Sequence, residues 1–365
     1  MRAEPPEASE PARAPAPPAP PAPLHRVRSW FVGFPLLWPV VGLAALLAFN
    51  VIYHPGFIAV EIRGGHLYGT PVDLLHQGSK GILLAIGMTL VIASGGIDLS
   101  VGSVMALAGA LVALLARRAD LPLAAVLVLP LLLAAAAGLW NGLLVARAAI
   151  QPIIATLVLM TSGRGLAMLL TGGQNLAVDR PGFVALGNGH LFGLPVTIYV
   201  VAAVLAAAGL LLRRTALGLL LEATGDNERA SRASGVDARL VKIAVYVASG
   251  VCAGLAGLVA TANIKQADPI RVGEMMELDA IFAVVVGGTA LTGGRFTLAG
   301  SVIGALLIQT LTQTMFYLGI PPSIAPVPKA VIVLAVCLLQ SARFREDVGR
   351  PIGRLIRRLT GRPAR

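Results

Sequence analysis

Long apolar runs separated by short polar stretches fill this sequence between residues 35 and 340. A helix needs about 20 mostly apolar residues to cross a bilayer. Ten runs approach that length, and they lie at 35–52, 77–94, 101–116, 121–146, 152–170, 194–212, 241–264, 278–292, 296–318 and 325–340. The second, third and eighth are short or interrupted by glycine, which favours broken or re-entrant helices. The pattern predicts an all-α fold, a polytopic transmembrane helical bundle of about eight to ten spans.

Composition supports a membrane protein. The chain is 56% hydrophobic and 13% charged, with a mean hydropathy of +0.80, whereas soluble domains contain about 25% charged residues. The net charge of +11 accompanies no nucleic-acid motif, so we expect no nucleic acid partner. Positive charge gathers in the cytoplasmic loops of membrane proteins. With both termini in the cytoplasm, 20 of the 29 Lys and Arg residues fall on that side, and Arg117 and Arg118 are exceptions.

The two ends of the chain differ from its middle. Residues 1–34 begin with a Pro/Ala-rich stretch that offers too little apolar surface to fold, which predicts a disordered cytoplasmic tail. Residues 35–341 form the predicted transmembrane domain, and residues 342–365 form a basic cytoplasmic tail.

Candidate chemistry is sparse along the chain. Cys252 and Cys337 lie inside apolar runs and the five histidines are scattered, so we expect neither a disulfide nor a metal site. No nucleophile–base pattern indicates an enzyme. The sequence also lacks the GxxxxGKS/T phosphate-binding loop, so we expect no ATP bound by that route and no cofactor.

The most informative stretch joins two apolar runs through Gly95-Gly96-Ile97-Asp98-Leu99-Ser100. An Asp between long apolar runs is costly in lipid and by default faces a cavity, a partner or a transport pathway. Gly95 and Gly96 let the helix break, and Ser100 is placed to cap the next helix. The alternative is that Asp98 itself caps that helix at the membrane surface, and the sequence leaves both readings open.

An internal echo accompanies this break. Gly95-Gly96 and Gly102-Ser103-Val104 recur 198 residues later as Gly293-Gly294 and Gly300-Ser301-Val302. Such matches arise by chance in helices rich in small residues, or they record a duplication. Internal repeats are common in transporters, whose substrate route lies at the repeat interface.

A mixed-charge loop at 216–236 is the longest on the predicted inner side. We expect it to be helical from Glu222 onward and interrupted by Gly225 and Gly235. A short helix held below the bilayer suits docking to a cytoplasmic partner, and a plain solvated loop is the alternative.

Three stretches resemble one family, the permease subunits of ribose/xylose/galactose-type sugar ATP-binding-cassette importers. GMTLVIASGGIDLSVGSVMALAGA at 87–110 is similar to the family signature, 216–257 resembles its cytoplasmic coupling region, and 277–307 resembles its C-terminal signature. The resemblance runs from about residue 35 to residue 340. The pattern at 67–74 looks closest to galactofuranose-type permeases.

This resemblance implies a subunit of the bacterial inner membrane that translocates a monosaccharide, such as galactofuranose or another pentose or hexose. The implied partners are a cytoplasmic ATP-binding subunit, a second permease (identical or paralogous), a periplasmic sugar-binding protein and membrane lipid. By analogy the substrate pathway includes Gly95, Gly96, Asp98, Ser100 and Asp279. The ATPase-coupling loop includes Glu222, Gly225, Asn227, Arg229 and Gly235.

The alternative function is an ion-coupled secondary transporter of a small polar solute. Such a protein needs several ionisable residues within its spans, and only Asp98 and Arg164 stand out. The sequence therefore favours the importer subunit.

Overall fold

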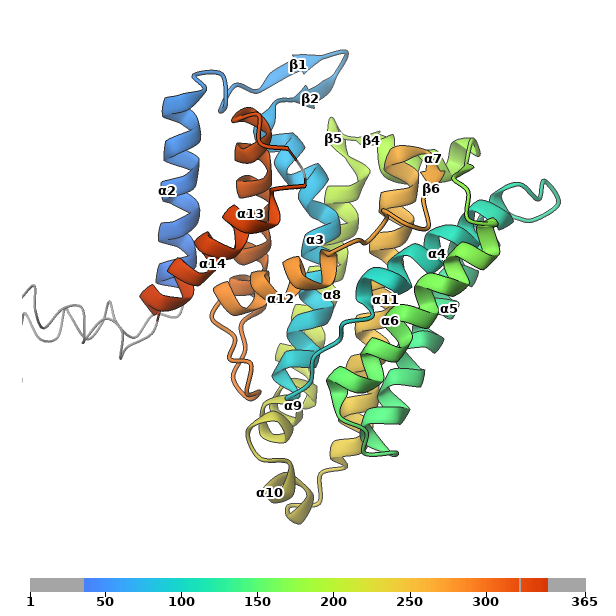
Figure 1. The fold of residues 1–365 in the computed structure, drawn as a ribbon, viewed down its shortest axis with the longest axis vertical. Helices are drawn as coiled ribbons and strands as arrows, with labels where there is room; N and C mark the ends of the chain where they lie inside the picture. The colour runs from blue at the N-terminus through green and yellow to red at the C-terminus, as the bar shows by residue number, and fades with distance from the viewer. Residues whose placement is uncertain (1–35, 322, 341–365) are drawn as a thin grey trace, which may run out of the picture. The chain divides into compact units, whose positions relative to one another are not determined.

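A computed structural model describes residues 36–321 and 323–340, so both predicted tails, 1–34 and 342–365, lie outside the described residues. Six helices are long and apolar enough to cross a membrane: α3 (Thr70–Ala93), α5 (Leu123–Ala146), α6 (Pro152–Thr171), α8 (Val196–Arg214), α11 (Ala238–Ile264) and α13 (Leu298–Tyr317). Three shorter apolar helices accompany them: α2 (Leu37–Tyr53), α4 (Val101–Ala116) and α14 (Pro326–Gln340). Figure 1 shows them as a bundle, which confirms the polytopic helical fold.

The three runs expected to be short or broken behave differently from one another. The run at 77–94 is wrong as a broken segment, because α3 extends it backward into an unbroken helix of 24 residues. The run at 101–116 is a helix of 16 residues, about 24 Å long and therefore shorter than the roughly 30 Å hydrocarbon layer. The run at 278–292 contains only α12 (Met276–Val286), whose 11 residues reach about 16 Å. Both α4 and α12 are therefore shorter than a full span.

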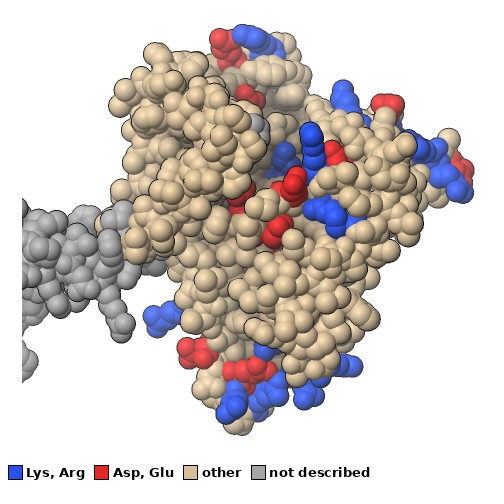
Figure 2. All heavy atoms as spheres, in the orientation of Figure 1, with Lys and Arg blue, Asp and Glu red and all other residues tan. Residues whose placement is uncertain are grey.

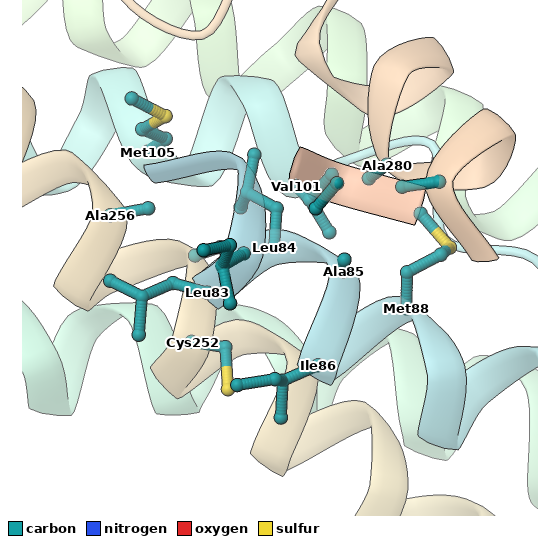
Figure 3. Close-up of a cluster of buried hydrophobic side chains, with 14 of the residues drawn as sticks. Leu83, Leu84, Ala85, Ile86, Met88, Val101, Met105, Cys252, Ala256 and Ala280 are labelled. Atoms are coloured by element: carbon teal, nitrogen blue, oxygen red, sulfur yellow. The ribbon is translucent and has the colours of Figure 1, made fainter. Parts of the chain in front are cut away.

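The centre of the bundle is formed by α3 and α11. Within the most apolar window of each helix, 72% of α3 and 67% of α11 is buried, against 11% for α8. Figure 3 shows Leu83, Leu84 and Ile86 of α3 meeting Cys252 and Ala256 of α11. Because α8 has few buried residues, it presents most of its apolar surface outward, as a lipid-facing helix does.

The strands form three two-stranded antiparallel pairs. They are β1 (Glu61–Arg63) with β2 (His66–Tyr68), β3 (Leu176–Ala177) with β6 (Gln266–Ala267), and β4 (His190–Leu191) with β5 (Leu194–Pro195). The short helix α7 (Pro181–Asn188) lies beside them. All of these elements lie at one end of the bundle, whereas α9 (Leu217–Asp226) and α10 (Glu228–Ala233) lie at the other (Figure 1).

Charged side chains follow the same division. Figure 2 shows Lys, Arg, Asp and Glu gathered over α9 and α10, with further groups at the strand-bearing end and in a hollow between them. Arg213 and Arg214 end α8 at the α9–α10 end. Arg117 follows α4 at the strand-bearing end, so the exception to the Lys/Arg distribution remains.

Candidate functional site

A cavity of about 680 Å³ opens between α3, α11, α12 and α13, and α14 closes one side of it. Its walls carry charged and hydrogen-bonding side chains from α3, α12, α13 and α14 and from the loop that precedes α12. They are Gln77, Lys80, Asp268, Arg271, Asp279, Gln309, Thr312, Gln313 and Lys329. The hollow in Figure 2 that contains both acidic and basic atoms lies on this part of the molecule. Amide, hydroxyl and charged groups that converge on one cavity form the arrangement expected of a site for a polar solute.

Lys80 lies near the middle of α3 and lines this cavity. Its ammonium donates a hydrogen bond to Gln77 Oε1 at 3.0 Å. None of the ion pairs within residues 36–321 and 323–340 includes Lys80. An ionisable residue at this depth marks a functional position by default. Lys80 was not predicted from the sequence, although it lies within the apolar run at 77–94.

Asp279 is the one predicted pathway residue that lines the cavity. Its Oδ2 accepts a hydrogen bond from Lys329 Nζ at 2.8 Å, and the side chains are 28% and 15% exposed. This ion pair joins α12 to α14. Asp279 therefore has a partner, and the pair links a partial span to the last described helix.

Arg164, which the sequence analysis singled out within a span, supports the entrance to α12. Its guanidinium donates from Nη1 to the carbonyl oxygens of Pro269 and Val272, at 3.0 and 2.6 Å. The carboxylate of Asp268 accepts the backbone N–H groups of Ile270 and Arg271. These bonds fix the turn that precedes α12, which positions one wall of the cavity.

Asp98 lies away from the cavity, in a buried hydrogen-bond network. The side chain is 1% exposed. Its Oδ1 accepts from the backbone N–H and the hydroxyl of Ser100, at 3.0 and 2.6 Å, and its Oδ2 accepts from Ser249 Oγ at 2.9 Å. Asn141 Nδ2 donates to Ser100 Oγ at 2.9 Å. The network ties the segment between α3 and α4 to α5 and α11.

This geometry corrects one expectation about the break. Ser100 occupies the N-cap position of α4, but its side chain makes no capping bond, because its hydroxyl donates to Asp98. Asp98 is buried among these hydrogen-bond partners. Its carboxylate holds a turn whose residues leave α3 at Gly95, where φ is +80°.

Gly225 of α9 lies directly against the end of α3. A Cβ atom at this position would overlap the carbonyl oxygen of Ala93. That same oxygen accepts the backbone N–H of Gly294 at 2.9 Å. Gly95 is also in contact with Gly293, where an added Cβ would lie 3.0 Å from the Gly95 Cα atom. The two glycine pairs of the internal echo therefore meet in space, directly beside Gly225.

The other predicted coupling residues surround α9 and α10. The helix begins at Leu217, earlier than the expected start at Glu222, because the apolar residues ahead of Glu222 continue the same helix. Asn227 Oδ1 accepts the N–H of Ala230 and caps α10. Arg229 is exposed, and Gly235 forms the turn into α11 with a φ of +87°.

Glu228 connects α10 to the first turn of α11. Its carboxylate accepts hydrogen bonds from Arg232 and from Lys242, the latter at 2.6 Å. Partial burial raises the pKa of Glu228, but the hydrogen bonds and charges of Lys242 and Arg232 outweigh burial and hold its pKa below the ordinary value. The ion pairs fix the position of α10 relative to the bundle.

Within the described residues, no group of three or more His, Cys, Asp or Glu side chains is placed to hold a metal ion. The structure instead offers a polar cavity between helices of the bundle, and a pair of short helices, α9 and α10, at one end of the bundle. The first of these, α9, contacts the end of α3 and the segment before α13.

Comparison with known proteins gives a consistent result. Residues 70–339 match the family described as branched-chain amino acid transport system / permease component. The chain is 46% identical over 315 residues to the galactofuranose transporter permease protein YtfT of Escherichia coli, covering 86% of this chain and 91% of that protein. It is 37% identical to the fructose import permease protein FruF of Bifidobacterium longum, over 85% of this chain and 88% of that protein.

A third relative is the ribose import permease protein RbsC of Escherichia coli, 36% identical over 83% of this chain and 93% of that protein. No solved structure matches the chain. Because the family match spans most of the bundle and these relatives align over most of their own length, the chain belongs to the family of ATP-binding-cassette importer permease components.

Proposed function

We propose that this chain translocates a monosaccharide and that the 680 Å³ cavity is its half of the pathway. The observation that carries the proposal is the set of amide, hydroxyl and ammonium groups on the cavity wall. These groups hydrogen-bond with the hydroxyls of a sugar. A branched aliphatic side chain, by contrast, would leave them unpaired at a cost of about 1–3 kcal/mol each. The names of the three relatives also favour a sugar over an amino acid, and YtfT favours galactofuranose.

Membership of the importer family implies a separate ATPase subunit and a substrate-binding protein as partners. We add to this a second permease chain, identical or paralogous, whose cavity completes the pathway. The polar wall around Lys80 is open on one side, so a single chain encloses only part of a solute.

The route from the ATPase to the cavity follows the contacts at Gly225. We propose that the ATPase subunit docks on α9 and α10, where Glu222, Asn227, Arg229 and Gly235 also lie. Movement of α9 is transmitted through Gly225 to the end of α3 and to the segment before α13. Because α3 and α13 both line the cavity, such movement changes its access from one side of the membrane to the other.

The pathway role of Gly95, Gly96, Asp98 and Ser100 is proposed in an indirect form. These residues hold the break between α3 and α4 in one conformation and do not line the cavity. Their contribution to transport is then the stability of that break.

Uptake of labelled monosaccharides into cells that express the whole importer tests the proposal. We expect uptake to require this chain and cellular ATP, and to be competed by galactofuranose more strongly than by leucine. Competition by leucine alone would contradict the sugar assignment. Uptake that survives ATP depletion but stops with an uncoupler would favour an ion-coupled transporter.

A further inference from the structure

A second cavity, of about 830 Å³, lies at the α9–α10 end of the bundle, between α8, α9 and the start of α13. It shares no lining residue with the 680 Å³ cavity. One wall carries Arg213 and Arg214, the last two residues of α8. Neither arginine takes part in an ion pair within the described residues. The cavity thus contains two guanidinium groups that have no carboxylate bound to them.

Apart from Glu222 and Thr297, the remaining side chains on its wall are apolar. Leu210 on α8 and Leu219 on α9 line it, and they are 61% and 72% exposed. The α8 helix itself is almost unburied. Apolar side chains with this exposure, at the end of a membrane-spanning helix, are suited to contact with acyl chains.

Two further features set the charge of the cavity. Leu298 and Ala299, the first two residues of α13, form another wall, so the positive end of that helix dipole adds to the guanidinium charges. Glu222 is the single acidic residue on the wall, and it leaves the formal charge of the cavity positive. A ligand with an anionic head and apolar tails matches this combination.

We infer that this cavity is a binding site for one anionic phospholipid, with its phosphate held by Arg213 and Arg214 and its acyl chains against α8. Guanidinium groups bind phosphate in a bidentate manner. Basic pockets between membrane helices bind anionic headgroups in the same way. The site also brings the lipid into contact with α9, next to Glu222 of the proposed coupling loop.

The first test measures the phospholipids that remain bound to the full-length chain, with any subunits that accompany it. The protein is placed in nanodiscs of phosphatidylethanolamine with a minority of phosphatidylglycerol and then re-extracted in mild detergent. We expect the wild type to retain phosphatidylglycerol at several times its share in the bilayer. The double variant R213Q/R214Q should lose this enrichment, and the matched pair R117Q/R118Q at the opposite end should keep it.

A second variant separates a lipid from a free phosphate ion. An added Cβ at Gly209, on the cavity wall, meets no atom within 4 Å, so Gly209→Leu fills the space for an acyl chain and leaves both arginines in place. We expect Gly209→Leu to remove the enrichment. Gly165→Leu is the matched control, because Gly165 is equally free of neighbours on α6. Excess inorganic phosphate should not displace the lipid.

Three outcomes overturn the inference. The first is an R213Q/R214Q protein that retains its enrichment of phosphatidylglycerol. The second is an R117Q/R118Q protein that loses as much of the enrichment as R213Q/R214Q does. A wild type with no enrichment would also overturn it.

Discussion

At the scale of single residues, the membrane-embedded polar groups divide into two kinds. Asp98 has both carboxylate oxygens occupied by hydrogen bonds and is fully enclosed. Lys80 has one hydrogen bond, to Gln77, and the remainder of its ammonium faces a cavity. A satisfied buried group stabilises a structure, whereas an ammonium with unused donors is available to a solute.

Lys80→Gln is therefore expected to reduce sugar uptake by at least about tenfold, because a hydrogen bond to a charged group contributes about 1.5–3 kcal/mol. The amount of protein in the membrane should not change, since Lys80 has no ion-pair partner to leave behind. Transport of labelled sugar per unit of protein measures this effect. Lys265→Gln is the control, because Lys265 is exposed beyond the end of α11, and a loss of equal size there would contradict a role specific to the cavity.

At the scale of elements, the packing of several helices depends on glycines whose contacts leave no room for a side chain. The glycines at 95, 225, 293 and 294 bring α3, α9 and the segment before α13 together. Gly225→Ala is expected to abolish ATP-coupled uptake, because the methyl group would overlap the carbonyl oxygen of Ala93 and separate α9 from α3. Uptake and ATP hydrolysis, measured on the same proteoliposomes, distinguish uncoupling from inactivation.

Two further glycines serve as graded controls for that substitution. Gly235→Ala meets no neighbouring atom, but its φ of +87° adds a strain of about 1–2 kcal/mol. We expect a moderate loss there. Gly165→Ala meets no neighbour either and should transport normally. If all three variants behaved alike, close packing at Gly225 would not be the cause.

The attachment of α10 to α11 should depend on pH in a defined direction. Because the pKa of Glu228 is held below its ordinary value, its ion pairs contribute stability at every pH above the unfolded value of about 4.3. That contribution is lost only as the pH falls through the lower pKa of the folded state. Glu228→Gln removes it at neutral pH.

Hydrogen exchange of the α10 amides measures this contribution. At neutral pH we expect faster exchange in Glu228→Gln than in the wild type. The difference should persist to about pH 4.3 and vanish in stronger acid. A difference that disappeared already between pH 6 and pH 5 would show that another group controls α10.

The positions of the helices were largely predictable from the sequence. Apolar runs located the helices, since burial in lipid requires them. The start of α3 was missed because Asp73 and His76 lower the hydropathy of its first turns, although the helix backbone satisfies its own polar groups regardless. The break at Gly95 was predicted correctly, because glycine readily adopts the positive φ with which the chain leaves α3.

The site itself was less accessible to sequence reasoning. Lys329 and Asp279 are 50 residues apart, and the partners of Asp98 come from α5 and α11. Such pairings depend on the packing of distant helices, which no local pattern records. The resemblance at 216–257 identified the loop that contains Gly225, but not the oxygen of Ala93 against which it packs.

At the scale of the whole molecule, the chain is a multi-pass protein of the inner membrane, with strand pairs at one end and α9–α10 at the other. The Lys/Arg distribution predicts that the α9–α10 end faces the cytoplasm. Phe192, 90% exposed between β4 and β5, and Arg229 on α10 are convenient markers of the two sides.

With Cys337 replaced by Ala, a cysteine at Phe192 is expected to react with a membrane-impermeant maleimide on intact spheroplasts. A cysteine at Arg229 should react only after the membrane is opened. Cys252 is buried and should stay unlabelled in both cases. Labelling of Arg229→Cys on intact spheroplasts would contradict the predicted orientation and place the α9–α10 end outside.

The meeting of Gly95 and Gly293 beside Gly225 limits how many independent motions the chain has. Each glycine pair precedes a helix, α4 or α13. Gly225 of α9 lies against Ala93 at the end of α3 and against Gly293 and Gly294, and Gly293 in turn contacts Gly95. We therefore expect a displacement of α9 to reach the segments before α4 and before α13 at the same time. We expect the segments around Gly95 and Gly293 to change conformation together. A partial movement then transports no solute, and a defect in either segment produces the same phenotype.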